Sequence, residues 1–465
     1  MTETDSNPHP TLPPGAGRAA HQFAQAVRRP IEEFLHIEAA GGIVLLVAAT
    51  VAVVWANSPF AHSWEALWHT PIGLTLGSWS FVRELHFWIN DGLMTVFFLV
   101  VGLEVKQEIV QGALASWQRA ALPIAAALGG MLVPALVYFL LNPGEPFRQG
   151  WGVPMATDIA FAVGILTLLG KRVSPSLRVL LLALAIIDDI GAILVIAVFY
   201  TASLNLTGFL IAGFGLLVLY TFVRIGVRPG VGWLAIPLVL IWSGLHIAGI
   251  HPTLAGVIVG LAVPVESWVG GAGFLAMARK AVADFQDRVA AQAPDHDLVE
   301  PLEELAFARR EATISPAVRL EHTMHPWVAY AIMPLFALAN AGVPLGGIGF
   351  DQPGLIGVFS GVSLGLFLGK PLGVLLVSWL AVRLKLCTLP VGVSWGGLAV
   401  VGLVAGIGFT MAIFIAELAF ASPELLAVAK LGVLVSTALA AVAGLLVGRA
   451  ILPMPSVTAG LTSDR

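Results

Sequence analysis

Long apolar stretches alternate with short polar connections along most of the chain. A helix rises about 1.5 Å per residue, so about 20 apolar residues cross a hydrocarbon core roughly 30 Å thick. Twelve stretches reach or approach this length, and we predict a transmembrane helix in each. They cover residues 39–56, 87–103, 120–141, 150–169, 177–199, 204–223, 233–249, 252–265, 327–341, 354–382, 394–420 and 423–452.

The distribution of basic residues orients these spans. The seventh and eighth spans are separated only by Ile-His-Pro, so hydropathy alone also allows eleven spans. Of the 24 Lys and Arg residues, 18 lie in alternate connections that begin with the N-terminal tail, and only Arg83 and Arg148 lie in the others. Because positive connections stay in the cytoplasm, both termini are predicted there, and such regular alternation requires an even count. We therefore predict twelve spans.

The chain divides into two tails and one membrane unit. Residues 1–37 and 453–465 are predicted to be cytoplasmic tails around a single transport unit at 38–452. Within this unit, the charged segment 266–326 is predicted to be a solvated cytoplasmic loop. Alternating apolar positions around Gly77-Ser78 predict an outer β-hairpin at 70–82. This hairpin could mediate a homodimer or simply pack on the membrane surface.

Composition excludes several functional classes. Of 465 residues, 58% are hydrophobic and 11% charged, whereas a soluble domain carries roughly 25% charged residues. The net charge of −4 provides no basic surface for nucleic acid, so membrane lipid is the expected surrounding. The single cysteine, Cys387, cannot form an internal disulfide, and no pattern for a structural metal or cofactor is visible.

Four charged residues lie deep inside predicted spans. They are Asp158 in the fourth span, Asp188 and Asp189 in the fifth, and Lys370 in the tenth. A charge at the bilayer centre costs about 2.5 kcal/mol or more, so such residues are candidates for function and need partners. Their positions allow all four to lie near the midplane. The alternative interpretation is a set of ion pairs that only hold helices together.

Two spans are predicted to be broken in mid-membrane. Pro154 removes a backbone donor in the fourth span, and Thr157 can bond the freed backbone groups. Gly402, Gly406 and Gly408 weaken the eleventh span. Interrupted helices in corresponding halves indicate a transporter binding site. The predicted fold is therefore an all-α membrane protein with twelve transmembrane helices, in which spans 3–5 and 10–12 are inverted repeats.

The buried charges favour a small cation. Asp188 and Asp189 point about 100° apart on a helix, so they should have different tasks. Three acids against one lysine leave up to two negative charges. Carboxylates, the Thr157 hydroxyl and freed carbonyls are oxygen ligands suited to sodium. Competition between sodium and a proton for one carboxylate is enough to couple their transport.

At these residues the chain resembles the NhaA-type sodium/proton antiporters, across residues 36–450. The resemblance implies secondary transport rather than enzyme catalysis, in a bacterial inner membrane, with more protons exchanged than sodium ions. It also implies lithium transport, control of cytoplasmic pH and sodium, no cofactor, and a dimer formed through the hairpin. The matching motifs include WINDGLMTVFFLVVGLEVKQE, ATDIAFAVGIL, AIIDDIGAILVIA, HPTLAGVIVG, LEHTMHPWVAYAIMPLFALANAG, GKPLG and GFTMAIFIAELAF.

The resemblance also assigns roles to residues. Asp189 would bind the transported ion directly, and Asp188 would help to bind sodium or gate its path, paired with Lys370. Asp158 with Thr157 would compensate charge at the helix crossing. Asp91 is a further acid that the family shares. A cytoplasmic funnel and pH response would involve Glu104, Lys106, Glu108, His251, Glu321, His322 and His325.

Three alternatives stay open. Glu321, His322 and His325 could equally mark a solvated helix start at a loop boundary. An intramembrane aspartyl protease could use Asp158 and Asp188 as a dyad, although its GxGD pattern is missing and Lys370 would disturb a shared proton. A sodium-coupled symporter of an organic anion would use the same broken helices but needs a cationic pocket.

Overall fold

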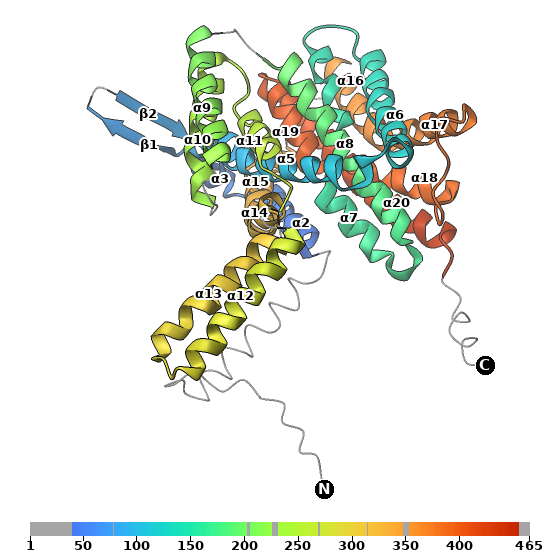
Figure 1. Cartoon of the computed structure of the whole chain (residues 1–465). Helices are drawn as coiled ribbons and strands as arrows, with labels where there is room; N and C mark the ends of the chain where they lie inside the picture. Colours follow the sequence, from blue (N-terminus) through green and yellow to red (C-terminus); the bar gives the residue numbers. More distant parts are fainter. Residues whose placement is uncertain are drawn as a thin grey trace, which may run out of the picture.

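The computed structural model is a bundle of helices with two projections (Figure 1). A two-stranded hairpin projects from one side and a pair of helices, α12 (Gly270–Ala290) and α13 (Asp295–Thr313), from one end. Both predicted tails fall outside the described residues, except for 453 and 454. The structure describes residues 40–77, 79–201, 205–225, 231–267, 270–313, 315–346 and 353–454.

Each predicted span overlaps a helix. By length and composition, five described helices can cross a membrane, or eight if each bent pair counts as one span. The five are α6 (Trp117–Leu141), α8 (Pro175–Phe199), α9 (Leu206–Ile225), the continuous α16 (Pro353–Leu364), η6 (Gly365–Gly369) and α17 (Lys370–Arg383), and α20 (Pro423–Ile451). Exposed apolar side chains on α9, such as Leu210 and Phe214, fit contact with lipid.

The remaining spans are shorter or interrupted helices. π-helical turns occur at η1, which contains Asp91, and at η6, directly before Lys370. Such turns often occur at functional sites. The segments are α2 (Ala40–Ala56), α4 (Leu85–Phe87), η1 (Trp88–Leu93), α5 (Met94–Val110), α10 (Val231–Ala248), α11 (Leu254–Ala262), η5 (Val328–Ile332) and α15 (Met333–Asn340).

The fourth and eleventh spans are broken, as predicted. Helix η3 (Phe147–Met155) meets α7 (Ile159–Leu168) at 46°, and α18 (Trp395–Ala405) meets α19 (Phe409–Ala419) at 48°. A third bend of 116° separates α2 from α3 (Ala61–Trp68).

Small residues bring the helices around these breaks together. A Cβ placed on Gly365 of η6 would lie 2.7 Å from the Pro154 Cβ in η3, which a real side chain could not occupy. Gly129 and Gly373 likewise allow α6 and α17 to pack closely. Backbone contact of this kind holds membrane helices together where hydrophobic burial supplies no driving force between them.

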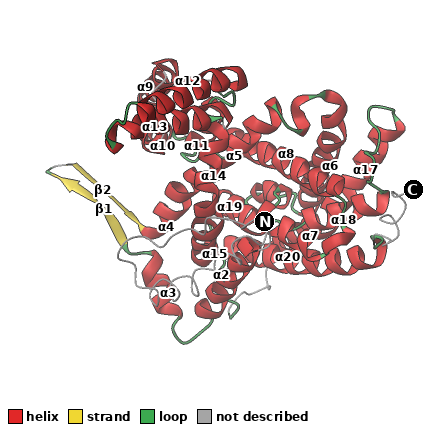
Figure 2. Ribbon diagram, turned by 60° about the horizontal axis from the view of Figure 1, so that its bottom comes forward, coloured by secondary structure: helices red, strands yellow, loops and turns green. Residues whose placement is uncertain are grey.

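The hairpin comprises β1 (Pro71–Leu76) and β2 (Trp79–Glu84), antiparallel with Leu74 opposite Phe81. Gly77 has φ +61°, a conformation that glycine adopts at little cost. Figure 2 shows the hairpin extending away from the helices. Leu74 is 69% exposed, so the hairpin presents apolar surface.

The segment expected to be a loop at 266–326 is largely helical. It forms α12 (Gly270–Ala290), α13 (Asp295–Thr313) and α14 (Pro316–Trp327). Charge density suggested a linker, but Phe274, Met277, Ala281 and Phe285 repeat at helical spacing, and α12 packs against α13 on a partly buried face.

Ion pairs also join α12 and α13. Arg288 lies 2.7 Å from Glu300, and Lys280 lies 3.3 Å from Glu304. The hydrogen bond to Glu300 raises the pKa of the Arg288 guanidinium above its ordinary value.

Candidate functional site

The two broken spans cross at their breaks. The Asp158 backbone N–H, just before α7, donates to the Ile407 carbonyl between α18 and α19 at 2.8 Å. Each break frees backbone groups from helical bonding, and here one break satisfies a group of the other. The crossing therefore places the beginnings of α7 and α19 together.

The Asp158 carboxylate caps both of these half-helices. Its Oδ1 accepts from the Phe161 N–H of α7 at 3.0 Å. Its Oδ2 accepts from the Thr410 N–H of α19 at 3.2 Å and from the Thr410 hydroxyl. Helix N-termini carry partial positive charge, so two helix ends stabilise this buried carboxylate. The two helix ends thereby compensate the charge of Asp158.

Asp188 is compensated by Lys370. The Lys370 Nζ lies 2.8 Å from the Asp188 Oδ2, and neither side chain has exposed surface. The ammonium also donates to the Met155 carbonyl at the end of η3. The Thr157 Oγ1 lies 2.7 Å from the Asp188 Oδ2 and 3.0 Å from the Ala405 carbonyl. Because a hydroxyl has one proton, Thr157 can donate to only one of these acceptors at a time.

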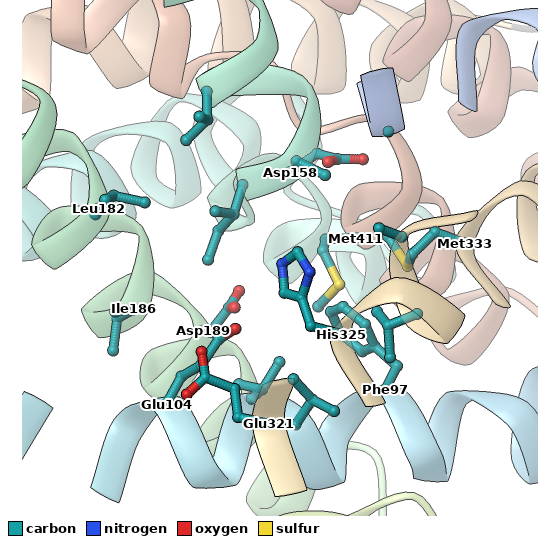
Figure 3. A pocket seen from close by; sticks show the side chains of 18 of the residues that line it. Phe97, Glu104, Asp158, Leu182, Ile186, Asp189, Glu321, His325, Met333 and Met411 are labelled. Atoms are coloured by element: carbon teal, nitrogen blue, oxygen red, sulfur yellow. The ribbon is translucent and has the colours of Figure 1, made fainter. Parts of the chain in front are cut away.

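Asp189 differs from both of its neighbours. Its side chain is 1% exposed, yet neither carboxylate oxygen has a hydrogen-bond partner among the described residues. The one-residue offset from Asp188 turns Asp189 to a different face of α8, and Asp189 lines a cavity that Asp188 does not line (Figure 3).

The cavity has a volume of about 840 Å³ and connects Asp189 to exposed residues. Figure 3 shows Asp189 of α8 and Glu104 of α5 on one side, with His325 of α14 across from them. His322 and His325 are exposed, whereas Asp158 and Asp189 are buried. The cavity therefore opens at the end of the molecule where α14 lies. Its ionisable and polar lining comprises Glu104, Gln107, Glu108, Thr157, Asp158, Asp189, Glu321, His322, His325 and Tyr330.

Side-chain hydrogen bonds join the elements around the mouth of the cavity. The Gln107 side chain donates to the Glu321 carboxylate at 2.6 Å, which joins α5 to α14. The Glu108 carboxylate accepts from the Ala113 N–H at 2.7 Å, beyond the end of α5. Helix α14 begins at Pro316 with Ser315 as its N-cap, so Glu321 and both histidines lie inside a helix, not at the expected helix start.

Comparisons with known proteins agree with this architecture. A family model described as Na+/H+ antiporter 1 matches residues 32–447. The chain is 57% identical to the Na(+)/H(+) antiporter NhaA 2 of Sorangium cellulosum, covering 95% of this chain and 94% of that protein. It is 52% identical to NhaA 2 of Myxococcus xanthus and 51% identical to NhaA of a Janthinobacterium species, in each case over at least 95% of both chains.

The chain belongs to the Na+/H+ antiporter 1 family. The match spans both broken helices and the cavity.

Some residues singled out from the sequence lie outside the cavity of this antiporter-family chain. Asp188, Lys370 and Lys106 do not line it. His251 and Asp91 also lie elsewhere, with the His251 Nε2 3.4 Å from the Asp91 Oδ1. The His251 Nδ1 lies 2.7 Å from the Thr253 hydroxyl, and its ring packs edge-on against a phenylalanine. Two residues that were predicted separately are thus neighbours.

Sequence reasoning missed the contact residue of Asp158. Thr157 was paired with it, but the hydroxyl that contacts Asp158 belongs to Thr410. The available signal was the position of Thr410, two residues after Gly408 at the glycine break of the eleventh span. Gln107, which bonds Glu321, and the pair Glu417–Lys430 were also not assigned to any site.

The donor set suits a transported alkali cation better than a resident transition metal. Among the described residues, no group of three or more His, Cys, Asp and Glu side chains could hold a metal ion. The residues around the inner end of the cavity instead supply carboxylate and hydroxyl oxygens from Asp189, Asp158 and Thr157. Hard cations prefer oxygen ligands.

Proposed function

We propose that this chain exchanges sodium for protons across a membrane by alternating access. The observation that carries the proposal is the Asp189 carboxylate, which is buried at the inner end of an open cavity without a hydrogen-bond partner among the described residues. An uncompensated carboxylate in a membrane must bind a cation or a proton. The names of the relatives, which are Na+/H+ antiporters, support the same two ions.

Competition at Asp189 provides the coupling. Sodium that enters the cavity displaces the proton from the carboxyl group, and a proton that arrives from the other side displaces sodium. Asp188, paired with Lys370 and in contact with Thr157, assists binding. Asp158, whose carboxylate caps two half-helices, compensates charge at the crossing. We extend the proposal to lithium, to exchange of more protons than sodium ions, and to control of cytoplasmic pH and sodium.

The distribution of the basic residues among the connections supports an inner-membrane protein. It supports a cytoplasmic location for both termini and for the cavity mouth. We assign the pH response to Glu104, Glu321, His322 and His325, which line the cavity through which ions would enter. Lys106 and Glu108 belong to the same helix end, and His251 with Asp91 forms a separate buried pair.

The competing functions lack a necessary feature. A symporter of an organic anion needs a cation available to the substrate, but Lys370 already contacts Asp188 and the Met155 carbonyl. An aspartyl protease needs two carboxylates that share a proton, whereas Asp188 pairs with lysine and Asp158 accepts hydrogen bonds from two helix ends.

The test is dissipation of a proton gradient in everted membrane vesicles on addition of sodium, lithium or potassium, between about pH 6.5 and pH 8.5. We expect a response to sodium and lithium, none to potassium, and loss of the response in Asp189→Asn. Asp287→Asn, on the exposed face of α12, is the matched control and should retain it. Wild-type exchange in Asp189→Asn would refute the role of this carboxylate.

A further inference from the structure

A second buried ion pair lies away from the cavity. Glu417 of α19 and Lys430 of α20 are joined at 2.5 Å, with side chains 14% and 10% exposed. Glu417 follows Thr410 by seven residues, so it lies about 10 Å further along the same half-helix. The pair is therefore separate from the crossing at Asp158 but is on the rigid segment that holds it.

Polar groups from other elements face this pair. The His86 Nε2 of α4 lies 3.8 Å from the Glu417 carboxylate and 2.9 Å from the Asn340 Oδ1 of α15. The Asn340 amide donates to the Asn90 Oδ1 of η1 at 2.8 Å. These contacts form a seam, with α19 and α20 on one side and α4, η1 and α15 on the other.

Three helices share the same order of residues between the cavity and the seam. In α19 the order is Met411, which lines the cavity, then Phe414, then Glu417. In α15 it is Met333, which also lines the cavity, then Phe336, then Asn340.

The third helix completes the layer. Val101 of α5 lines the cavity, followed toward the seam by Phe98 and, in η1, by Asn90. Phe414 packs against Phe98 at 5.5 Å and Phe336 at 6.1 Å, and all three are at most 1% exposed. An apolar layer thus separates the cavity from the polar seam.

We propose that Glu417 and Lys430 are positioning residues for transport, and that their mutual neutralisation, called the latch below, lets the seam close over them while the cavity is open. This inference rests on the proposed function and its alternating access. When the seam is closed, each charge is neutralised by the other, so α4 and α15 can cover them. To release an ion on this side, the seam and the phenylalanine layer beneath it must part.

The latch predicts the direction in which the KM for sodium changes on each side of the membrane. In Lys430→Gln, the closed seam has to cover a carboxylate that has lost its lysine, whereas the open seam allows water to solvate this carboxylate. The variant should therefore favour the state that is open at the seam. Apparent affinity scales with the population of the competent state. The KM for sodium should fall at the seam side and rise at the cavity side.

The experiment measures sodium KM from each side, in right-side-out and everted vesicles. For Lys430→Gln we expect opposite shifts on the order of fivefold. Glu417→Gln leaves the ammonium unpaired and should shift both values in the same directions. In the double variant Glu417→Gln/Lys430→Gln the closed seam covers neither of these charges, so both KM values should return toward those of the wild type. Glu417→Asp, which keeps the charge but shortens its reach, should show a smaller shift and serves if a larger change prevents folding.

Glu145→Gln is the matched control. Glu145 pairs with Arg148 at 3.2 Å, is about half exposed, and lines a cavity together with Leu418 and Ala419 near the end of α19. Its loss should leave both KM values unchanged. Equal KM changes on both sides in Lys430→Gln, or a double variant shifted further than the single ones, would overturn the latch. Absence of sodium-dependent exchange in the wild type would overturn the proposed function itself.

Discussion

Replacement of Lys370 by methionine tests whether the crossing depends on a buried ion pair. The ammonium lies 2.8 Å from the Asp188 carboxylate and also donates to the Met155 carbonyl, and no part of either charged side chain is exposed. Methionine fills a similar volume but supplies no donor. Among the described residues, Asp188 would then keep the Thr157 hydroxyl as its one hydrogen-bond donor, which it shares with the Ala405 carbonyl.

The expected loss is large for one substitution. Removal of one member of a buried pair costs about 3–5 kcal/mol, because the remaining charge stays desolvated. The Met155 carbonyl loses its donor as well, which costs about 1–3 kcal/mol if it stays unsatisfied. The two costs overlap as the site relaxes, so we expect about 3 kcal/mol or more. The double variant Lys370→Met/Asp188→Asn buries no charge and should recover most of this loss.

Thermal unfolding of the four proteins of this cycle, purified in the same detergent, gives the measurement. Lys370→Met should lower Tm by about 3 °C or more, because the unfolding entropy grows with chain length. Lys280→Met removes a lysine from an exposed pair and should leave Tm unchanged. An unchanged Tm in Lys370→Met would show that the pair adds no stability. A double variant no more stable than Lys370→Met would show that the loss comes from packing and not from an unpaired charge.

Two further predictions concern other parts of the chain. Burial raises the pKa of the Cys387 thiol, so at pH 8 a smaller share of this thiol is ionised than in an exposed cysteine. Maleimide should therefore label the native protein more slowly than the unfolded protein. Equal labelling rates would contradict this prediction. If the hairpin forms a dimer, Leu74→Glu on its exposed surface should lower the protein mass measured by light scattering in detergent, and Glu84→Gln should leave this mass unchanged. A monomeric wild type would refute dimerisation through the hairpin.

The sequence predicted most of the membrane architecture because a bilayer permits few solutions. Uninterrupted apolar length indicates a helix, and Pro154 or the glycines near Gly406 indicate where it breaks. The helices α12 and α13 were missed because their charged residues outweighed a repeat of apolar positions that becomes informative only when the two faces meet. Solvated charge and helical structure are compatible, and charge density alone does not distinguish a linker from a helical hairpin.

The site was predictable in its residue types but not in its pairings. Charges inside spans identified Asp158, Asp188, Asp189 and Lys370, because each is costly in lipid. Which groups compensate them depends on how two breaks cross, and neighbours in the sequence mislead: Thr157 bonds Asp188, not the adjacent Asp158.

The same consideration explains the omission of Glu417. It lies near the end of the predicted eleventh span, where a charge can reach the membrane surface at little cost. Its burial depends on α4 and α15 from other parts of the chain.

The unequal compensation of the three aspartates bears directly on exchange. Asp158 is stabilised by two helix ends and Asp188 by a lysine, so binding a cation at either would have to displace a group that the fold already supplies. Asp189 has no such group among the described residues. A sodium ion and a proton therefore bind most readily at the same carboxylate, and binding of one opposes binding of the other. Two ions that share one uncompensated charge are exchanged; their joint transport would require a second such charge at this depth.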